Sequence, residues 1–145
     1  VAIGELSTSI GEADITEVEM VTTTADKSEG FTISVRVRYN EPVDVVTTGG
    51  TPTLAVTNSN DGTGSGRGPH SLSYASGTGT NELIFSLAIA AANAATNADD
   101  VLSVGAQTIA LNSGTMKDAS GTASDAALVI SGALGTAAGT VTVTA

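Results

Sequence analysis

Hydrophobic and polar residues alternate strictly from Phe31 to Tyr39. Ile33, Val35 and Val37 continue the apolar positions, and Thr, Ser and Arg residues lie between them. Period two over this stretch predicts a half-buried β-strand, because successive side chains of a strand point to opposite faces. We expect this strand at the centre of the fold, with its two arginines on a solvated face where they pair with carboxylates of neighbouring strands.

The same alternation recurs in shorter pieces along the chain. Asn40, Glu41 and Pro42 are expected to close the first strand, since proline cannot donate a ladder hydrogen bond. The stretch from Ser59 to His70 contains four glycines and a proline and is predicted to be a surface loop. For residues 88–100, rich in alanine, a loop or a single helical turn is favoured over a long helix. The remaining apolar pieces predict strands near 43–47, 52–58, 72–74, 83–89, 101–104, 109–111, 128–130 and 141–143.

Glycines interrupt the alternation between Tyr74 and Leu83. A phosphate-binding loop would need a GK[ST] sequence or a third glycine opening a helix, and neither follows Gly77 and Gly79. The tip is therefore interpreted as a hairpin turn.

Seven to nine short strands with closely spaced turn signals predict an all-β fold, an antiparallel β-sandwich, with a barrel as the weaker alternative. The division expected is an N-terminal arm over 1–15, the sandwich over 16–131, and a C-terminal arm or last strand over 132–145. The arms carry apolar residues that need a covering surface, on their own domain or on a partner, and they are the predicted partner-binding positions: Ile3, Leu6, Ile10, Val141 and Val143.

Composition fits this interpretation and excludes several classes of site. The 145 residues can bury a substantial core without crosslinks. Cysteine is absent, which excludes disulfides, thiolate zinc sites and a cysteine nucleophile. The 17 glycines, together with abundant threonine and valine, favour strands and tight turns over helices.

Charge narrows the range of partners. The formal net charge is −10, which disfavours nucleic acid and anionic membrane surfaces as partners. No signal peptide and no apolar run of membrane-spanning length is recognised, so membrane insertion is not expected.

Catalytic and metal sites find little support in the residues. His70 is the only histidine, it lies in the glycine-rich segment without a G-x-S-x-G motif, and it is interpreted as a loop residue. No cofactor is expected. Calcium is the one metal left open, because Asp99 with Asp100, or Asp118 with Asp125, could gather an ion at a loop end; the alternative is solvated turn carboxylates. An EF-hand calcium site is excluded near Asn58, because the residues there do not fall at the ligand positions of its calcium-binding loop.

Two further chemistries remain as alternatives. Carbohydrate binding by aromatic stacking has only Tyr39 and Tyr74 to use, and both alternate with the core side. Lys27 or Lys117 could form an intramolecular isopeptide bond with an asparagine, although both lie in apparent loops.

Five blocks of residues follow one another along the chain: GFTISVRVRY at 30–39, NEPV at 40–43, GTPTL at 50–54, YASGTGTNELIF at 74–85 and NSGTMKDASG at 112–121. Together they resemble the bacterial immunoglobulin-like repeats of large surface and adhesin-type proteins. The resemblance covers about residues 15–130. Three features depart from the family pattern. They are the glycine-rich loop, the turn after the strand of Phe85, where alanines take the place of acidic residues, and the two arms. The matching positions are Gly30, Ile33, Val35, Val37, Tyr39, Asn40, Glu41, Pro42, Val43, Gly50, Thr51, Pro52, Thr53, Leu54, Tyr74, Ser76, Gly77, Gly79, Thr80, Asn81, Leu83, Phe85, Asn112, Gly114, Met116, Lys117, Asp118 and Gly121.

The resemblance implies an immunoglobulin-like sandwich without catalysis, a module that is also found on tailed-phage virions. Two functions follow as hypotheses. The first is a non-enzymatic structural protein that decorates a phage capsid or virion appendage, held to other virion subunits, or to copies of itself, through its arms. The second is a single repeat of a secreted bacterial adhesin or cell-surface filament, acting as a spacer or ligand-binding module.

Overall fold

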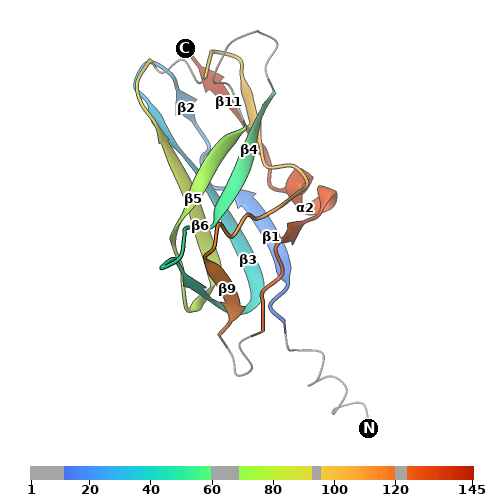
Figure 1. Cartoon of the computed structure of the whole chain (residues 1–145). Coiled ribbons are helices and arrows are strands. Elements are labelled where there is room, and N and C mark those ends of the chain that lie inside the picture. Colours follow the sequence, from blue (N-terminus) through green and yellow to red (C-terminus); the bar gives the residue numbers. More distant parts are fainter. Residues whose placement is uncertain (1–11, 60–68, 93–95, 120–123) are drawn as a thin grey trace.

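The computed structural model describes residues 12–59, 69–92, 96–119 and 124–145, and these form an all-β protein (Figure 1). Strands account for 56% of the described residues and helix for 5%. The all-β class predicted from the alternation is therefore confirmed.

Nine strands form one curled sheet, and two shorter strands pair separately. The two-stranded sheet consists of β8 (Gln107–Thr108) and β10 (Val129–Ile130), and a short helix, α2 (Gly132–Ala137), follows it. The nine strands of the large sheet are β1 (Ile15–Met20), β2 (Ala25–Asp26), β3 (Phe31–Val46), β4 (Thr53–Ser59), β5 (His70–Ser76), β6 (Thr80–Ile89), β7 (Val101–Ser103), β9 (Thr115–Asp118) and β11 (Thr140–Thr144).

The hydrogen-bonded path runs β1-β3-β6-β5-β4-β7-β11-β2, with β9 on the far half of β3. Strand β4 connects the two parts of this path. Its first residues, Thr53–Val56, pair with β5, whereas Thr57–Ser59 pair with β7. The two ends of the path are consecutive in the chain: β1 pairs antiparallel with β3, and β2 pairs parallel with β11. The sheet therefore curls so far that its two end strands, β1 and β2, come from one continuous stretch of the chain.

Strand β3 is longer than the sequence pattern predicts. Asn40, Glu41 and Pro42 were expected to end it, but the strand continues to Val46. The proline is accommodated because β3 changes partners there: its register with β6 shifts between Arg38 and Val43, and the later residues pair with β9. A proline at such an irregularity removes no ladder hydrogen bond.

The core follows the predicted alternation. Ile33, Val35 and Val37 are fully buried, while the arginines between them lie on the other face. Tyr39 is buried as well, and its hydroxyl donates a hydrogen bond to the carbonyl oxygen of Ala127 at 2.8 Å. Burial raises the pKa of Tyr39 well above its usual value.

The molecule is elongated, with two poles (Figure 1). The chain starts β1 and forms β9 at the lower pole. The upper pole contains β2, the start of β5 and the end of β11. Helix α2 lies on the side of the molecule, within the stretch predicted to be a C-terminal arm or last strand. Ser131 caps the helix by accepting a hydrogen bond from the backbone nitrogen of Leu134.

Candidate functional site

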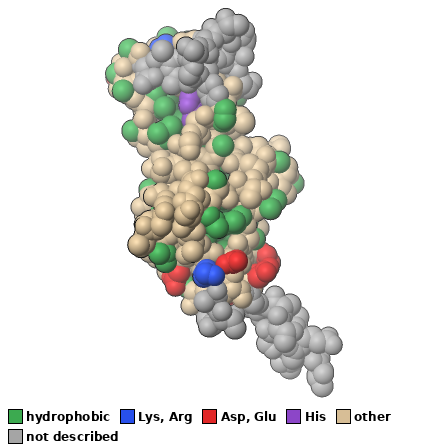
Figure 2. All heavy atoms as spheres, in the orientation of Figure 1, with side chains coloured by type: hydrophobic (Ala, Val, Ile, Leu, Met, Phe, Trp, Pro, Cys, Tyr) green, Lys and Arg blue, Asp and Glu red, His purple; other side chains and the backbone are tan. Residues whose placement is uncertain are grey.

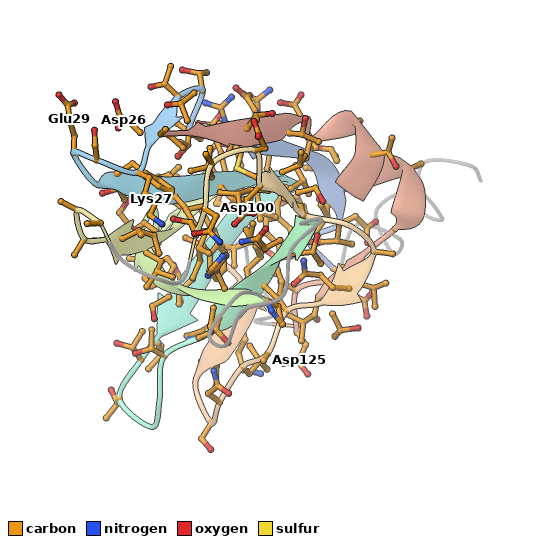
Figure 3. The ribbon with its side chains drawn as sticks, turned by 90° about the horizontal axis from the view of Figure 1, so that it is seen from above. Asp26, Lys27, Glu29, Asp100 and Asp125 are labelled. Carbon is orange, nitrogen blue, oxygen red and sulfur yellow. The ribbon has the colours of Figure 1, made fainter. Side chains whose placement is uncertain are left out.

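Five polar side chains from separate elements meet at the upper pole, which Figure 3 shows from above. They come from the end of β2, the end of β4, the start of β5 and the segment before β7: Lys27, Asn58, His70, Asn97 and Asp100. We call these five residues the polar cluster. His70 and Asp100 are buried, and buried polar groups are stable only with hydrogen-bond partners.

Asp100 is the anchor of the polar cluster. Its Oδ2 atom accepts hydrogen bonds from the backbone nitrogen of Asn97 at 2.7 Å and from Nδ2 of Asn58 at 3.0 Å. The backbone oxygen of Asp100 accepts from the nitrogen of Val143 in β11 at 2.8 Å. One residue therefore fastens the segment before β7 to β4 and to β11.

His70 is the first residue of β5 rather than a loop residue, so this expectation was wrong. It is 5% exposed, and its Nε2 atom lies 3.2 Å from Nδ2 of Asn58. Because that amide nitrogen is a donor, Nε2 acts as the acceptor and the imidazole is neutral. Burial lowers the pKa of His70, and the negative charge of Asp100 partly opposes this shift.

Lys27 completes the polar cluster. Its Nζ atom donates a hydrogen bond to Oδ1 of Asn97 at 2.8 Å, across a separation of 70 positions. The adjacent carboxylate of Asp26 is turned toward Ser28, whose hydroxyl and backbone nitrogen both donate to Oδ1 of Asp26. These hydrogen bonds lower the pKa of Asp26.

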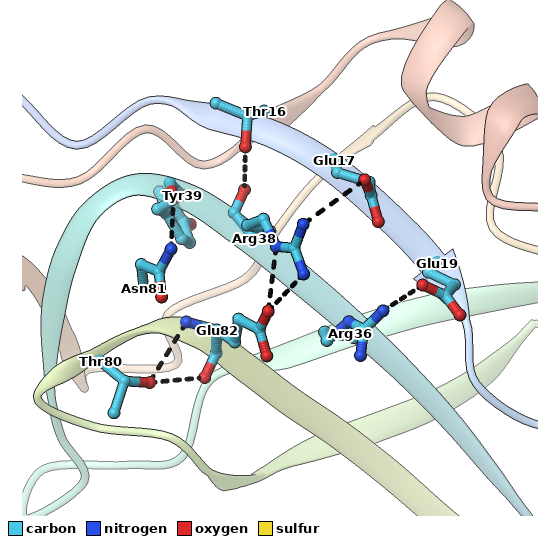
Figure 4. Close-up of polar contacts among 9 residues, drawn as sticks. All are labelled: Thr16, Glu17, Glu19, Arg36, Arg38, Tyr39, Thr80, Asn81 and Glu82. Atoms are coloured by element: carbon cyan, nitrogen blue, oxygen red, sulfur yellow. Dashed lines mark hydrogen bonds and ion pairs between the residues drawn. The ribbon is translucent and has the colours of Figure 1, made fainter.

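A second polar group lies on the outer face of β1, β3 and β6 (Figure 4). Arg38 contacts Glu82 through Nε at 3.0 Å and Glu17 through Nη1 at 3.8 Å, and Arg36 pairs with Glu19. All these side chains are partly exposed, so each pair is worth little energetically. The expectation that the β3 arginines pair with cross-strand carboxylates is confirmed.

Charged side chains are unevenly spread over the molecule. On the face seen in Figure 2, acidic and basic side chains gather near the lower pole, while the middle is almost free of charge. Lys117 contributes another pair, because its Nζ atom lies 2.8 Å from Oδ1 of Asp125.

The glycine tip between β5 and β6 uses its backbone donors internally. The nitrogen of Thr78 donates to the hydroxyl of Tyr74, that of Gly79 to the oxygen of Val43, and that of Thr80 to the oxygen of Gly77. A phosphate cradle needs such N–H groups directed at the ligand. The tip is therefore a structural turn, as the sequence pattern indicated.

The predicted partner-binding residues fall into two groups. Val141 and Val143 are 3% and 0% exposed. Of the two covering surfaces considered for the arms, their own domain or a partner, it is their own domain that covers these two valines. Ile3, Leu6 and Ile10 lie outside the described residues. Ala13, within the predicted N-terminal arm, is itself part of the core.

The two carboxylates of each pair considered for calcium differ in their exposure to solvent. Asp100 and Asp118 are buried, whereas Asp99 and Asp125 are exposed. Across the described residues, no group of three or more His, Asp or Glu side chains is arranged to hold a metal ion. Nor does any described helix have the length and apolarity to cross a membrane.

Sequence reasoning considered each member of the polar cluster separately and missed that they meet. Lys27 and His70 were each assigned to a loop, Asn58 was placed at the end of a predicted strand, and Asn97 was not singled out. No local motif joins positions so far apart, and the signal lies only in the pairing of β2, β4, β7 and β11.

Comparisons with protein-family models, with curated proteins and with solved structures found no match.

Proposed function

We propose that the chain is an immunoglobulin-like β-sandwich module with a non-enzymatic structural role, decorating a phage capsid or a virion appendage. The strand order supports the sandwich. In immunoglobulin domains, strands A, B, E and D form one layer and C, F and G the other. The path β1-β3-β6-β5 followed by β4-β7-β11 has this order, and β2 continues the first strand onto the second layer.

The observation that carries the proposed role is the position of the chain ends. The described chain enters at the lower pole and leaves at the upper pole, after strands that are both held in the sheet (Figure 1). The residues before Glu12 would anchor the module to a virion subunit, and the upper pole would then point outward. The apolar residues Ile3, Leu6 and Ile10 are the proposed anchors.

The chemistry of the described residues agrees with a structural role. His70, the only imidazole, is buried and engaged by Asn58, which suits a fold-stabilising residue better than a proton-transferring base. With a net charge of −10, proteins are favoured over nucleic acid or anionic lipid as partners, and copies that carry this charge remain soluble at high local concentration.

The second candidate is a repeat of a secreted bacterial adhesin or cell-surface filament. Chain ends at opposite poles favour this alternative too, because they allow copies to follow one another end to end. The reading frame distinguishes the two. Further copies of the module before Val1 or after Ala145 support the filament, and neighbouring genes for capsid or tail proteins support the virion.

Binding tests the virion assignment directly. The chain is mixed with particles of the virus that encodes it, prepared without this protein, and sedimented. We expect saturable binding that is lost in the triple variant Ile3→Ser, Leu6→Ser, Ile10→Ser and retained in the surface control Val129→Ser, whose site is 65% exposed. A monomeric chain with no affinity for particles and no neighbouring virion genes would contradict the proposal.

A further inference from the structure

The contact between Lys27 and Asn97 differs from those of the other described cations. Arg36, Arg38 and Lys117 each face a carboxylate, but Lys27 donates to a side-chain amide at 2.8 Å. A C=O bond measures about 1.2 Å, so the amide carbon of Asn97 lies within about 4 Å of the Lys27 amine. An amine and a carboxamide carbon at this separation are close to reacting distance.

Both residues are held by their backbones. The nitrogen of Lys27 donates to the oxygen of Thr144 at 2.9 Å, and its oxygen accepts from Ala92 at 2.8 Å. The nitrogen of Asn97 is fixed by the Asp100 carboxylate at 2.7 Å, and its oxygen accepts from the nitrogen of Asp100 at 3.2 Å. The fold has already met the entropic cost of bringing these two side chains together.

We propose that Lys27 and Asn97 form an intramolecular isopeptide bond. Nζ of Lys27 attacks the side-chain amide carbon of Asn97, the new Nζ–C bond forms, and the bond from that carbon to the amide nitrogen breaks. Two protons of the lysine ammonium leave with the departing NH₂ group, so ammonium ion is released. No oxidant, metal or cofactor enters the balance.

Asp100 acts as a positioning residue in this reaction. Its carboxylate holds the Asn97 backbone and also binds Asn58, so the amide is presented from a fixed turn. An ammonium group has no free electron pair, so the reaction uses the neutral amine and should be faster at higher pH.

The bond would close a covalent loop between the end of β2 and the segment before β7. A crosslink spanning 70 positions restricts the unfolded chain much as a disulfide does, in a protein that has no cysteine. This inference is independent of the assignment to virion or filament.

Intact mass measures the reaction directly. We expect the folded chain to weigh about 17 Da less than its sequence mass, the weight of one ammonia. Its net charge should also be one unit more negative, because a lysine ammonium is lost. Proteolysis should yield a joined peptide pair that contains both Lys27 and Asn97.

Variants separate this bond from other sources of ammonia loss. Lys27→Arg keeps a cation but cannot form the amide, so it should retain the full mass, whereas the matched control Lys117→Arg should still show the loss. Asp100→Asn should slow the loss in a chain whose circular dichroism is unchanged. A wild-type chain that keeps its full sequence mass after prolonged incubation at alkaline pH, with the two residues in separate peptides, would overturn the proposal.

Discussion

The hydroxyl of Tyr39 donates a hydrogen bond to the backbone oxygen of Ala127, 88 positions later in the chain. It ties the central strand β3 to the segment that precedes β10. Tyr39 is 1% exposed and the hydrogen bond is partly buried, so water can replace the hydroxyl only in part.

Replacement of Tyr39 by phenylalanine removes that donor and keeps the ring. We expect the free energy of unfolding to fall by about 1–2 kcal/mol, the cost of an unsatisfied buried carbonyl. Urea denaturation measures it. Tyr74→Phe is the control, because its hydroxyl contacts an exposed backbone nitrogen, that of Thr78, and water can replace it. Equal losses in the two variants would contradict the role assigned to Tyr39.

The stability of the fold should depend on the protonation of His70. Unfolded histidine binds a proton near pH 6.5, whereas burial lowers the pKa of His70 in the fold. Between these two values the unfolded state binds more protons, so the free energy of unfolding decreases as pH falls. Protonation also removes the acceptor that Asn58 uses.

The measurement is a series of urea unfolding curves from about pH 7.5 to about pH 5, for the wild type and for His70→Gln. Carboxylates that titrate at lower pH affect both chains alike. The wild type should lose more stability than the variant over this interval. Parallel curves would show that His70 does not titrate differently in the two states.

Gly77 should resist substitution. It has φ +115°, and a Cβ atom there would lie 2.1 Å from the backbone oxygen of Glu82. Gly77→Ala is therefore expected to cost about 2–3 kcal/mol. Gly105→Ala measures the effect of backbone strain alone, because its φ is +69° but nothing lies within 4 Å of the added Cβ atom. Its free energy of unfolding is expected to fall by about 1 kcal/mol. Gly132→Ala, at an open helical position, should be neutral or slightly stabilising. Thermal unfolding of the three variants tests this order, and a harmless Gly77→Ala would contradict it.

Phe85 is, after Tyr39, the largest of the fully buried side chains. It is fully buried and packs edge-to-face against Tyr74, with ring centroids 6.0 Å apart. Phe85→Ala should destabilise the fold by about 3–5 kcal/mol, through lost burial and the cavity left behind. Val129→Ala, at an exposed site, should change stability by less than about 0.5 kcal/mol in the same denaturation assay. A similar loss in both would contradict the placement of Phe85.

The alternation from Phe31 to Tyr39 was sufficient to predict the central strand and its buried face, because side-chain direction in a strand depends only on position. The end of that strand was not predictable in this way. Pro42 is compatible with continuation only because β9 replaces β6 as the partner of β3, and that exchange depends on residues more than 70 positions later.

The candidate site was harder to predict from the sequence than the fold. His70 looked like a loop residue because the residues before it in the sequence are glycine and proline, and its hydrogen-bond partner Asn58, itself bound to Asp100, lies on another element. Lys27 and Asn97 meet because β2 and β7 both border β11. Local patterns report which residues are buried in a regular strand, but not which strand ends share a pole.

The parallel pairing of β2 with β11 has a mechanical consequence. Strand β11 is the last strand of the chain and β2 follows the first strand, β1, with Val143 opposite Ala25 and Thr144 opposite Asp26. Once β1 has separated from β3, tension applied between the chain ends would pull β2 and β11 in opposite directions along their length. Their hydrogen bonds would then be strained in shear and would have to rupture together rather than one after another. A module pulled through its ends would therefore resist first at the pairing of β1 with β3 and then at this seam.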